Sequence, residues 1–228
     1  MLARLALSAA AVWLGYAWSA HLATPLCVHR GPRDAGLRVA LTFDDGPDPE
    51  WTPRVLDTLA RDGVRATFFL VGERAVRAAT TVRAIAGAGH EVGSHGWSHR
   101  SFWLCGPRRT AMEIDRTQAM LAGITGCAPR FFRPPWGMVN AAMFPMLRTR
   151  GLRPVFWSIQ PEGRRPAPAD AQAAYVVARA HPGAIVDLHD AEGAPGAPAR
   201  VLAALPAMIA GLRDRGYAFT TVGELLAA

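Results

Sequence analysis

The chain has 228 residues, of which 50% are hydrophobic, so it is long enough to bury the core of one domain and to carry a short extension. Its net charge is +7, and all 25 basic residues are Arg. They are scattered along the sequence with no aromatic interleaving, which argues against the basic stripe of a nucleic-acid-binding surface, so we expect no nucleic-acid partner.

The N-terminal segment differs from the rest of the chain. Arg4 precedes an uncharged apolar run, Leu5–Ala20, which continues weakly to Val28. Such a run is typical of a secretory signal, and a membrane-spanning helix needs about 20 apolar residues. Because small-residue cleavage sites are poor, residues 1–30 are predicted to be an uncleaved single-pass membrane anchor in preference to a cleaved signal peptide. A helix buried in the domain formed by 31–228 is the third alternative.

The remaining sequence alternates strand-like and helical segments. Short apolar runs predict seven strands, near Arg38–Phe43, Ala66–Val71, His90–Gly93, Phe131–Arg133, Pro154–Ile159, Ala184–Leu188 and Tyr217–Thr220. Helical segments lie between or after them, near Thr52–Arg61, Arg74–Ala88, Pro107–Ala122, Ala141–Arg150, Ala169–Ala180 and Ala199–Arg215. This alternation predicts an α/β fold, and composition alone leaves a barrel and a doubly wound sheet open.

The three cysteines, Cys27, Cys105 and Cys127, do not have the spacing of a metal site. An odd number of cysteines in an exported protein leaves at least one thiol unpaired. Free buried thiols are favoured over a Cys105–Cys127 bridge.

Two pairs of polar residues follow predicted strands. Asp44 and Asp45 end the first strand, and His95 and His99 come just after the third. One Asp and two His offer an oxygen and two imidazole nitrogens to a divalent metal and leave coordination positions open for water and substrate. The second carboxylate is then free to act as a base.

Further polar side chains stand at other strand ends. Arg133 precedes the rigid turn Pro134-Pro135-Trp136-Gly137, and His189 ends the strand that begins at Ala184. Between them, the run that contains Trp157 leads into a Pro-rich loop. Polar residues at the C-terminal edge of several strands are typical of a barrel enzyme with its site at that face.

With these ordered motifs, the chain resembles the polysaccharide deacetylase family, carbohydrate esterases that include chitooligosaccharide and peptidoglycan N-deacetylases. The resemblance extends from Leu37 to the C-terminus. It implies an incomplete, seven-fold β/α barrel, here preceded by an N-terminal hydrophobic helix. It also implies a general base (Asp44), three metal ligands (Asp45, His95 and His99), an arginine that orients the base (Arg133), a general acid (His189), and substrate or oxyanion contacts (Trp136, Pro135, Trp157 and Leu188).

These roles agree with the chemistry of amide hydrolysis. A bound divalent metal lowers the pKa of its water to about 7 and polarises the carbonyl, and zinc is the metal we expect most, with cobalt or another divalent ion also suitable. Asp44 can take the proton of the water. His189, with an ordinary pKa near 6.5, can give one to the leaving amine. Arg133 would keep Asp44 ionised.

Two departures from the family pattern concern loops. Gly96 replaces the Ser or Thr that commonly follows the first metal-binding His, which predicts a more flexible metal loop. Gln160 and Gly163 occupy a stretch where the family usually has Asp residues, one of which holds the acid His in its tautomer. Glu162 is a candidate replacement, although its longer side chain need not reach His189.

Asp187 is the most unusual residue, because the family usually has an apolar residue there that lines the pocket for the acetyl methyl group. Strand alternation puts Ile185, Asp187 and His189 on one face. A buried, unpaired carboxylate is costly, so we predict that Asp187 holds His189 through a direct or one-water hydrogen bond. An ion pair with Arg133 or Arg153 is the alternative.

The function predicted from this set is extracytoplasmic, metal-dependent hydrolysis of the N-acetyl amide of sugars in an envelope or exported polysaccharide. The protein would be membrane-anchored or secreted, and a monomer. A deformylase, or another amide hydrolase with a polar acyl pocket, is one alternative. A catalytically silent glycan-binding protein is the other, and the complete set of catalytic and metal-binding residues argues against it.

Overall fold

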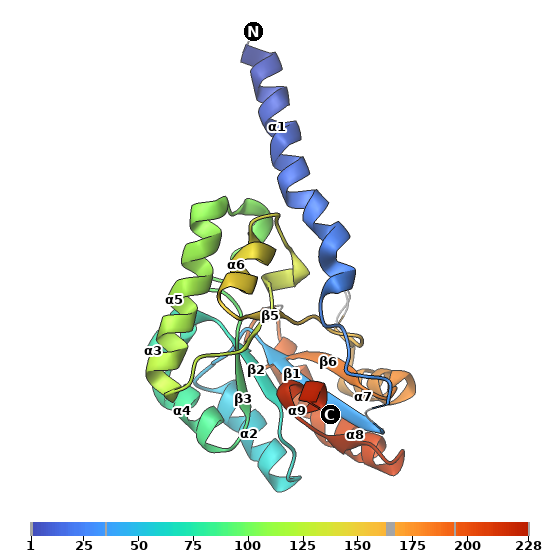
Figure 1. The fold of residues 1–228 in the computed structure, drawn as a ribbon. Helices are drawn as coiled ribbons and strands as arrows, with labels where there is room; N and C mark the ends of the chain where they lie inside the picture. The colour runs from blue at the N-terminus through green and yellow to red at the C-terminus, as the bar shows by residue number, and fades with distance from the viewer. Residues whose placement is uncertain (1, 35, 163–166, 194, 228) are drawn as a thin grey trace.

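Seven parallel strands form a single curled sheet in the computed structural model, which describes residues 2–34, 36–162, 167–193 and 195–227 (Figure 1). The strand order is β5-β4-β3-β2-β1-β6, and β7 pairs with β1. The bounds are β1 Arg38–Asp44, β2 Thr67–Leu70, β3 Glu91–Ser94, β4 Phe131–Phe132, β5 Arg153–Pro154, β6 Ala184–His189 and β7 Ala218–Phe219. The predicted incomplete, seven-fold β/α barrel is confirmed.

Helices cover the outside of the sheet (Figure 1). Their bounds are α1 Leu2–Trp18, α2 Trp51–Arg61, α3 Gly72–Arg77, α4 Ala79–Gly87, α5 Pro107–Thr125, α6 Met143–Thr149, α7 Ala169–Arg179, α8 Ala197–Asp214 and α9 Val222–Ala227, with 3-10 turns η1 Ser19–Leu26, η2 Phe102–Leu104 and η3 Pro135–Gly137. The single helix predicted near Arg74–Ala88 is two helices, because Ala78 leaves helical geometry at φ −128° and ψ 44°. The short helix α9 was not predicted.

Alternation along β1 and β6 separates an outer apolar face from an inner face. On β6, Ala184, Val186 and Leu188 point outward and pack in the main hydrophobic core with α7 and α8. The inner face begins with Ile185, in a second apolar cluster that includes Val222 and Leu225 of α9. The barrel interior is therefore apolar near the N-terminal ends of β1 and β6, which we call its lower half. Near the C-terminal ends, its upper half, it carries the polar residues of both strands.

The N-terminal segment forms part of the barrel wall. Val28 bridges to Val155 in parallel, and Arg30 bridges to Ala184 of β6. The strand predicted near Pro154–Ile159 is shorter in the structure, where it is β5. The residues that follow β5 pair through isolated bridges, the last of which joins Ile159 to Val186. These contacts fill the seam between the two edge strands of the sheet.

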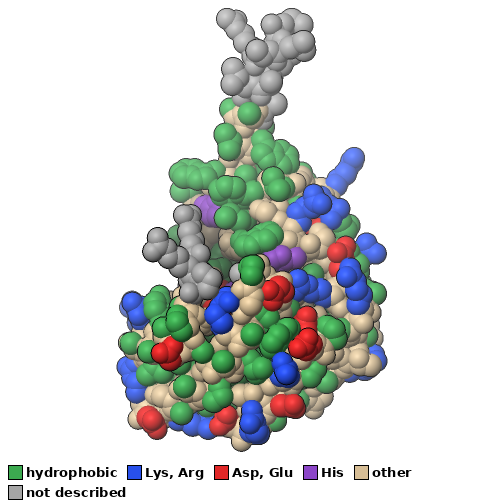
Figure 2. Space-filling model, turned by 180° about the vertical axis from the view of Figure 1, so that it is seen from behind, with side chains coloured by type: hydrophobic (Ala, Val, Ile, Leu, Met, Phe, Trp, Pro, Cys, Tyr) green, Lys and Arg blue, Asp and Glu red, His purple; other side chains and the backbone are tan. Residues whose placement is uncertain are grey.

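Helix α1 projects away from the barrel, and its C-terminal half contacts the loops at the top (Figure 1). The Trp13 indole donates a hydrogen bond to the Trp103 carbonyl at 3.0 Å, and the Tyr16 hydroxyl donates to the Cys105 carbonyl at 3.2 Å. Hydrophobic side chains gather where this helix leaves the body (Figure 2). Within the described parts of the chain, no helix has the length and apolar character to cross a membrane.

The described cysteines are free thiols, as favoured by the sequence. Cys105 is buried and Cys27 partly buried. The expectation of burial is wrong for Cys127, which is exposed in the turn after α5.

Candidate active site

The parallel register of β1 and β6 sets the site. Asp44 pairs with His189 at the upper ends of the two strands, and Thr42 pairs with Asp187 one inward-facing row below. All four side chains lie on the inner face of the barrel, because the two strands alternate in phase. The predicted base and acid are thus brought to facing positions by strand pairing.

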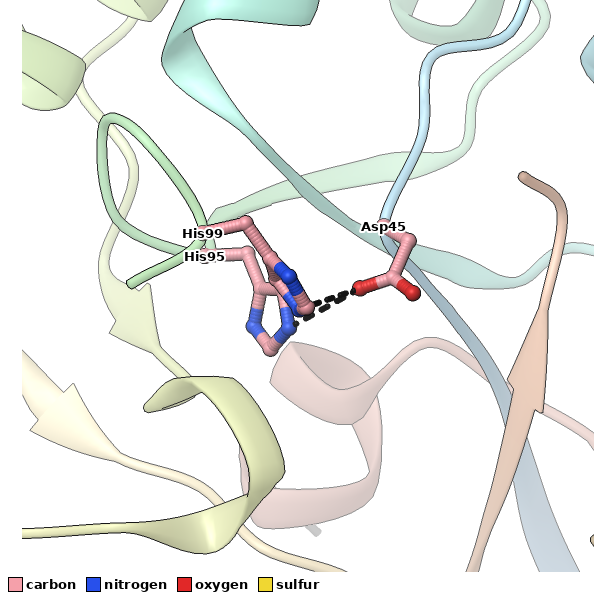
Figure 3. A group of neighbouring side chains, drawn as sticks. All are labelled: Asp45, His95 and His99. Atoms are coloured by element: carbon pink, nitrogen blue, oxygen red, sulfur yellow. Dashed lines mark ion pairs between the residues drawn. The ribbon is translucent and has the colours of Figure 1, made fainter. Parts of the chain in front are cut away.

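Asp45, His95 and His99 converge beside this row (Figure 3). Their candidate ligand atoms all lie within 4.8 Å of one another. His99 Nε2 is 2.8 Å and His95 Nε2 is 3.4 Å from Asp45 Oδ1, and His95 Nδ1 makes a 2.7 Å hydrogen bond with the Arg133 carbonyl, which leaves its Nε2 facing the group. Burial alone raises the pKa of Asp45, but His95 and His99 lower it far below its usual range.

The three residues fit a divalent metal ion. They offer one carboxylate oxygen and two imidazole nitrogens, and the buried Oδ1 of Asp45 accepts no well-aligned hydrogen bond from the described residues. The backbone contact of His95 is the kind of outer contact that fixes the tautomer of a metal-binding imidazole. The predicted ligand set is therefore placed together by the fold.

The loop between the two histidines is held by Glu113 of α5, a residue that the sequence analysis missed. Glu113 is fully buried, and its Oε2 accepts hydrogen bonds from the backbone N–H groups of Trp97 and Ser98, both at 2.8 Å. Its Oε1 accepts from the Ser98 hydroxyl at 2.7 Å and from Arg109 at 2.8 Å. These contacts restrain the loop that was expected to be loose because Gly96 lacks a hydroxyl.

Arg133 lies next to Asp44 and Asp187 and is fully buried. Its Nη1 donates to Asp44 at 2.7 Å, to Thr42 at 2.8 Å and to Asp187 at 3.1 Å. Its Nη2 donates to the Phe156 carbonyl at 2.8 Å. The predicted contact between Arg133 and Asp44 is present. The same guanidinium nitrogen, Nη1, also contacts Asp187.

The prediction that Asp187 holds His189 is wrong for a direct hydrogen bond, since none joins the two side chains among the described residues. Asp187 pairs with Arg133, which was the alternative, while Nδ1 of His189 lies 2.5 Å from Oε2 of Glu162. Burial, together with repulsion from Asp44, raises the pKa of Asp187 to about 7. Burial lowers the pKa of His189, but Glu162 and nearby carboxylates raise it to about 10. Glu162 therefore has the role that was predicted for Asp187, that of the hydrogen-bonding partner of His189.

A cavity of about 180 Å³ opens over the site. It is lined by Asp44, Asp45, His95, His99, Trp136, Gln160, Glu162, Asp187, His189, Gly193 and Ala197. Trp136 has a left-handed backbone at φ 54°, is 56% exposed, and its ring centroid lies 4.3 Å from that of His99. It therefore stands at the mouth of the cavity.

Three residues predicted to contact substrate are not among the residues that line the cavity. Leu188 is fully buried in the outer core, because it alternates with Asp187 and His189 on β6. Trp157 is half-buried, and its ring centroid lies 5.5 Å from the Arg133 guanidinium. Pro135 is buried beside Gly96. The prediction is therefore wrong for Leu188, and the other two lie outside the set of lining residues.

The loop after β6 also supports the metal group and was not predicted. A Cβ atom on Gly193 would lie 1.9 Å from Asp45 Oδ2, so only glycine fits against that carboxylate without a shift. Arg74 donates to the carbonyls of Asp45 at 2.9 Å and of Glu192 at 3.0 Å, which ties the two loops together. Neither residue belongs to a local motif, so only the folded chain reveals them.

Comparisons with known proteins agree with this geometry. Residues 33–155 match the family model described as polysaccharide deacetylase. A peptidoglycan-N-acetylglucosamine deacetylase of Bacillus cereus is 34% identical over 187 residues, which cover 82% of this chain and 67% of the relative. The peptidoglycan-N-acetylglucosamine deacetylase PgdA of Listeria monocytogenes is 36% identical over 188 residues, and the matched region spans 38% of its length and 82% of this chain.

The fold comparison gives the same result. The crystal structure of the Bc1960 peptidoglycan N-acetylglucosamine deacetylase superposes with a TM-score of 0.82 at 32% identity. The match covers 88% of this chain and 92% of the other. The likeness therefore extends over most of both chains.

Proposed function

The chain belongs to the polysaccharide deacetylase family, and we propose that it removes N-acyl groups, acetyl above all, from the amino sugars of an envelope or exported polysaccharide. The observation that supports this most is the facing pair of Asp44 and His189 beside the group of Asp45, His95 and His99. Peptidoglycan is the first substrate to test, because two relatives are named for its N-acetylglucosamine.

Asp45, His95 and His99 would hold the divalent metal, most suitably zinc, and the bound ion would polarise the acyl carbonyl and acidify water. Asp44 accepts the proton of the attacking water. Arg133 donates a hydrogen bond to Asp44 at 2.7 Å and so holds this carboxylate in place. The proton acceptor is thereby kept ready in a buried site.

His189 protonates the leaving amine in this proposal. Glu162 holds its Nδ1, so Nε2 remains for the substrate, and the raised pKa keeps the imidazole charged at neutral pH. The same carboxylate stabilises the imidazolium and fixes its orientation. Asp187 then serves as a partner of Arg133 in the wall of the cavity.

The backbone N–H of Trp136 is our candidate donor to the oxyanion, and its exposed indole is a candidate surface for a sugar ring. A sugar within a polymer would rest at the open mouth beside Trp136. Its acyl group would then enter the cavity between Asp44 and His189.

We propose an extracytoplasmic location with the N-terminal segment retained as a membrane anchor. Val12, Leu14 and Trp18 of α1 are 73%, 64% and 64% exposed, and residues 5–20 carry no charge. A helix that is apolar on several sides is stabilised by lipid more than by water. A secreted form, cleaved near Ala20, is the alternative, and we propose a monomer in either case.

Incubation of the zinc-loaded protein with N-acetylated chitooligosaccharides and with peptidoglycan tests the function. Release of acetate and of free amino groups is expected, with loss of both on Asp44→Asn substitution. Glycan binding without release of any acyl group would instead favour the silent binding protein. Asp187 makes the cavity wall polar, and this supports a second candidate function. In that function the enzyme hydrolyses an acyl group other than acetyl, such as formyl.

A further inference from the structure

The inner part of the cavity is polar. Among its lining residues, Trp136 and Ala197 supply the apolar side chains, and Trp136 stands at the exposed mouth. Asp187 is only 1% exposed and lines the cavity beside His189. A small apolar group that entered this space would therefore meet a carboxylate.

Asp187 lies deeper than the reacting groups. It precedes His189 by two residues on the inner face of β6, and a strand rises about 3.3 Å per residue, so it lies roughly 6 to 7 Å farther from the mouth. In a polymer the sugar ring is joined to its neighbours and has to stay at the mouth. The acyl group is the terminal part of the amide, and in the proposed binding mode it would point past Asp44 and His189 toward Asp187.

The Asp187 carboxylate has unused capacity to accept hydrogen bonds. The Nη1 atom of Arg133 carries two hydrogens but serves Thr42, Asp44 and Asp187, and the contact to Asp187 is the longest, at 3.1 Å. A carboxylate accepts about four hydrogen bonds, and burial without them costs free energy. A methyl group placed there would exclude water and donate nothing.

We propose that the site prefers an N-acyl group with a hydroxyl on the carbon next to the carbonyl, the hydroxyacetyl amide, over the acetyl amide, with Asp187 accepting the hydrogen bond of that hydroxyl. The inference rests on the proposed amide hydrolysis and concerns only the acyl group. Water oxygen bonds to the carbonyl carbon and the carbon–nitrogen bond breaks. Asp44 takes a proton from the water, His189 gives one to the amine, and glycolate is released.

The neighbours of Asp187 favour a neutral donor. An ammonium on the acyl group would lie close to the Arg133 guanidinium, which already compensates part of the carboxylate charge. A formyl group is too short to carry a donor to Asp187. The hydroxyacetyl group differs from acetyl by one hydroxyl, which is a neutral donor on the carbon next to the carbonyl.

The test compares N-hydroxyacetyl and N-acetyl chitooligosaccharides of equal length with the zinc-loaded protein. A single hydrogen bond to a buried acceptor discriminates by roughly tenfold to a hundredfold, so we expect kcat/KM to favour hydroxyacetyl by at least about tenfold. Asp187→Leu removes the acceptor at similar size and should abolish or reverse this preference. Asp187→Ala gives the same information if the leucine variant does not fold.

Glu91→Gln is the matched control. Glu91 is a carboxylate on β3 that accepts hydrogen bonds from the Gly223 N–H at 2.8 Å and from Thr67 at 3.1 Å, at the opposite end of the barrel. The ratio of the two kcat/KM values should be unchanged in this variant. A wild-type preference for acetyl that Asp187→Leu leaves unaltered would overturn the proposal.

Binding of the released acids separates this inference from the proposed function. Titration calorimetry of the zinc-loaded protein should give a Kd for glycolate at least about tenfold lower than for acetate, and a ratio near one for Asp187→Leu. If wild-type protein hydrolysed neither amide, the proposed function would fail while the glycolate-to-acetate ratio still decided the preference of the pocket. Equal affinities in wild-type protein would refute the preference.

Discussion

Oε2 of Glu162 lies 2.5 Å from Nδ1 of His189, so a glutamate from the loop after β5 holds the imidazole at the end of β6. The interaction raises the pKa of His189, which reaches about 10 although burial alone would lower it. The imidazole is therefore charged throughout the neutral range, and it loses its proton only as the pH rises through this value. The acid and its partner come from segments 27 residues apart.

Glu162→Gln should move the basic limb of the pH–rate profile to lower pH. The amide keeps the size of the side chain but no longer stabilises the imidazolium, so the pKa of His189 falls. We expect a lower kcat above neutral pH and a smaller loss below it. Profiles of kcat against pH for wild type, Glu162→Gln and the exposed control Glu50→Gln check this. A basic limb that stays in place in Glu162→Gln would show that Glu162 does not determine the pKa of His189.

Removal of the metal should abolish hydrolysis. If Asp45, His95 and His99 are the ligands, chelation removes activity and added zinc or cobalt restores it, because both ions accept this mixture of nitrogen and oxygen donors. The double variant His95→Ala, His99→Ala should hold less than a tenth of the wild-type zinc content by mass spectrometry. Activity of that variant in the presence of a chelator would refute the metal assignment.

Glu113→Gln should weaken metal binding without touching a ligand. The variant replaces one of the two carboxylate oxygens that hold the loop of His95 and His99 by an amide group, and losses of outer contacts typically cost 10- to 100-fold in metal affinity. Cobalt titration of the metal-free protein, followed by its visible absorption, measures the Kd. Glu91→Gln, which changes a carboxylate far from the metal loop, should leave the Kd as in wild type. A Kd unchanged in both variants would mean that the loop is set by other contacts.

The full-length protein should sediment with membranes. With residues 5–28 retained, N-terminal peptides from the Ala3 region should be found by mass spectrometry of the membrane fraction. Val12→Glu and Leu14→Glu together should shift protein to the soluble fraction, since both side chains are exposed on α1. A soluble mature form that begins near Ala20 would establish cleavage instead.

The sequence contained much of the site because the reactive residues sit at strand ends. Asp44, Asp45, His95 and His99 follow apolar runs, so the parallel sheet brings them to one edge. Alternation also placed Asp187 and His189 on the inner face correctly. The same rule, applied to Leu188, would have assigned it to the outer core, and its prediction as a substrate contact was wrong for that reason.

The supporting contacts depend on packing between distant segments. Glu113 reaches the metal loop from the middle of α5, and nothing in its local sequence marks it as different from a surface glutamate. Whether Glu162 or Asp187 holds His189 is decided by the path of the loop after β5 and by the competing charge of Arg133. Hydrophobic periodicity carries neither kind of information.

The chain passes from α1 through η1 directly into the barrel wall, where Val28 and Arg30 fill the seam beside β6. A flexible linker would let an anchored enzyme sweep a volume that grows with linker length. Here the connection is hydrogen-bonded structure, so under the proposed anchoring the cavity would stay at one height above the bilayer. The reach of the enzyme would be set by the helix itself, and only glycan strands that pass at that height would be modified.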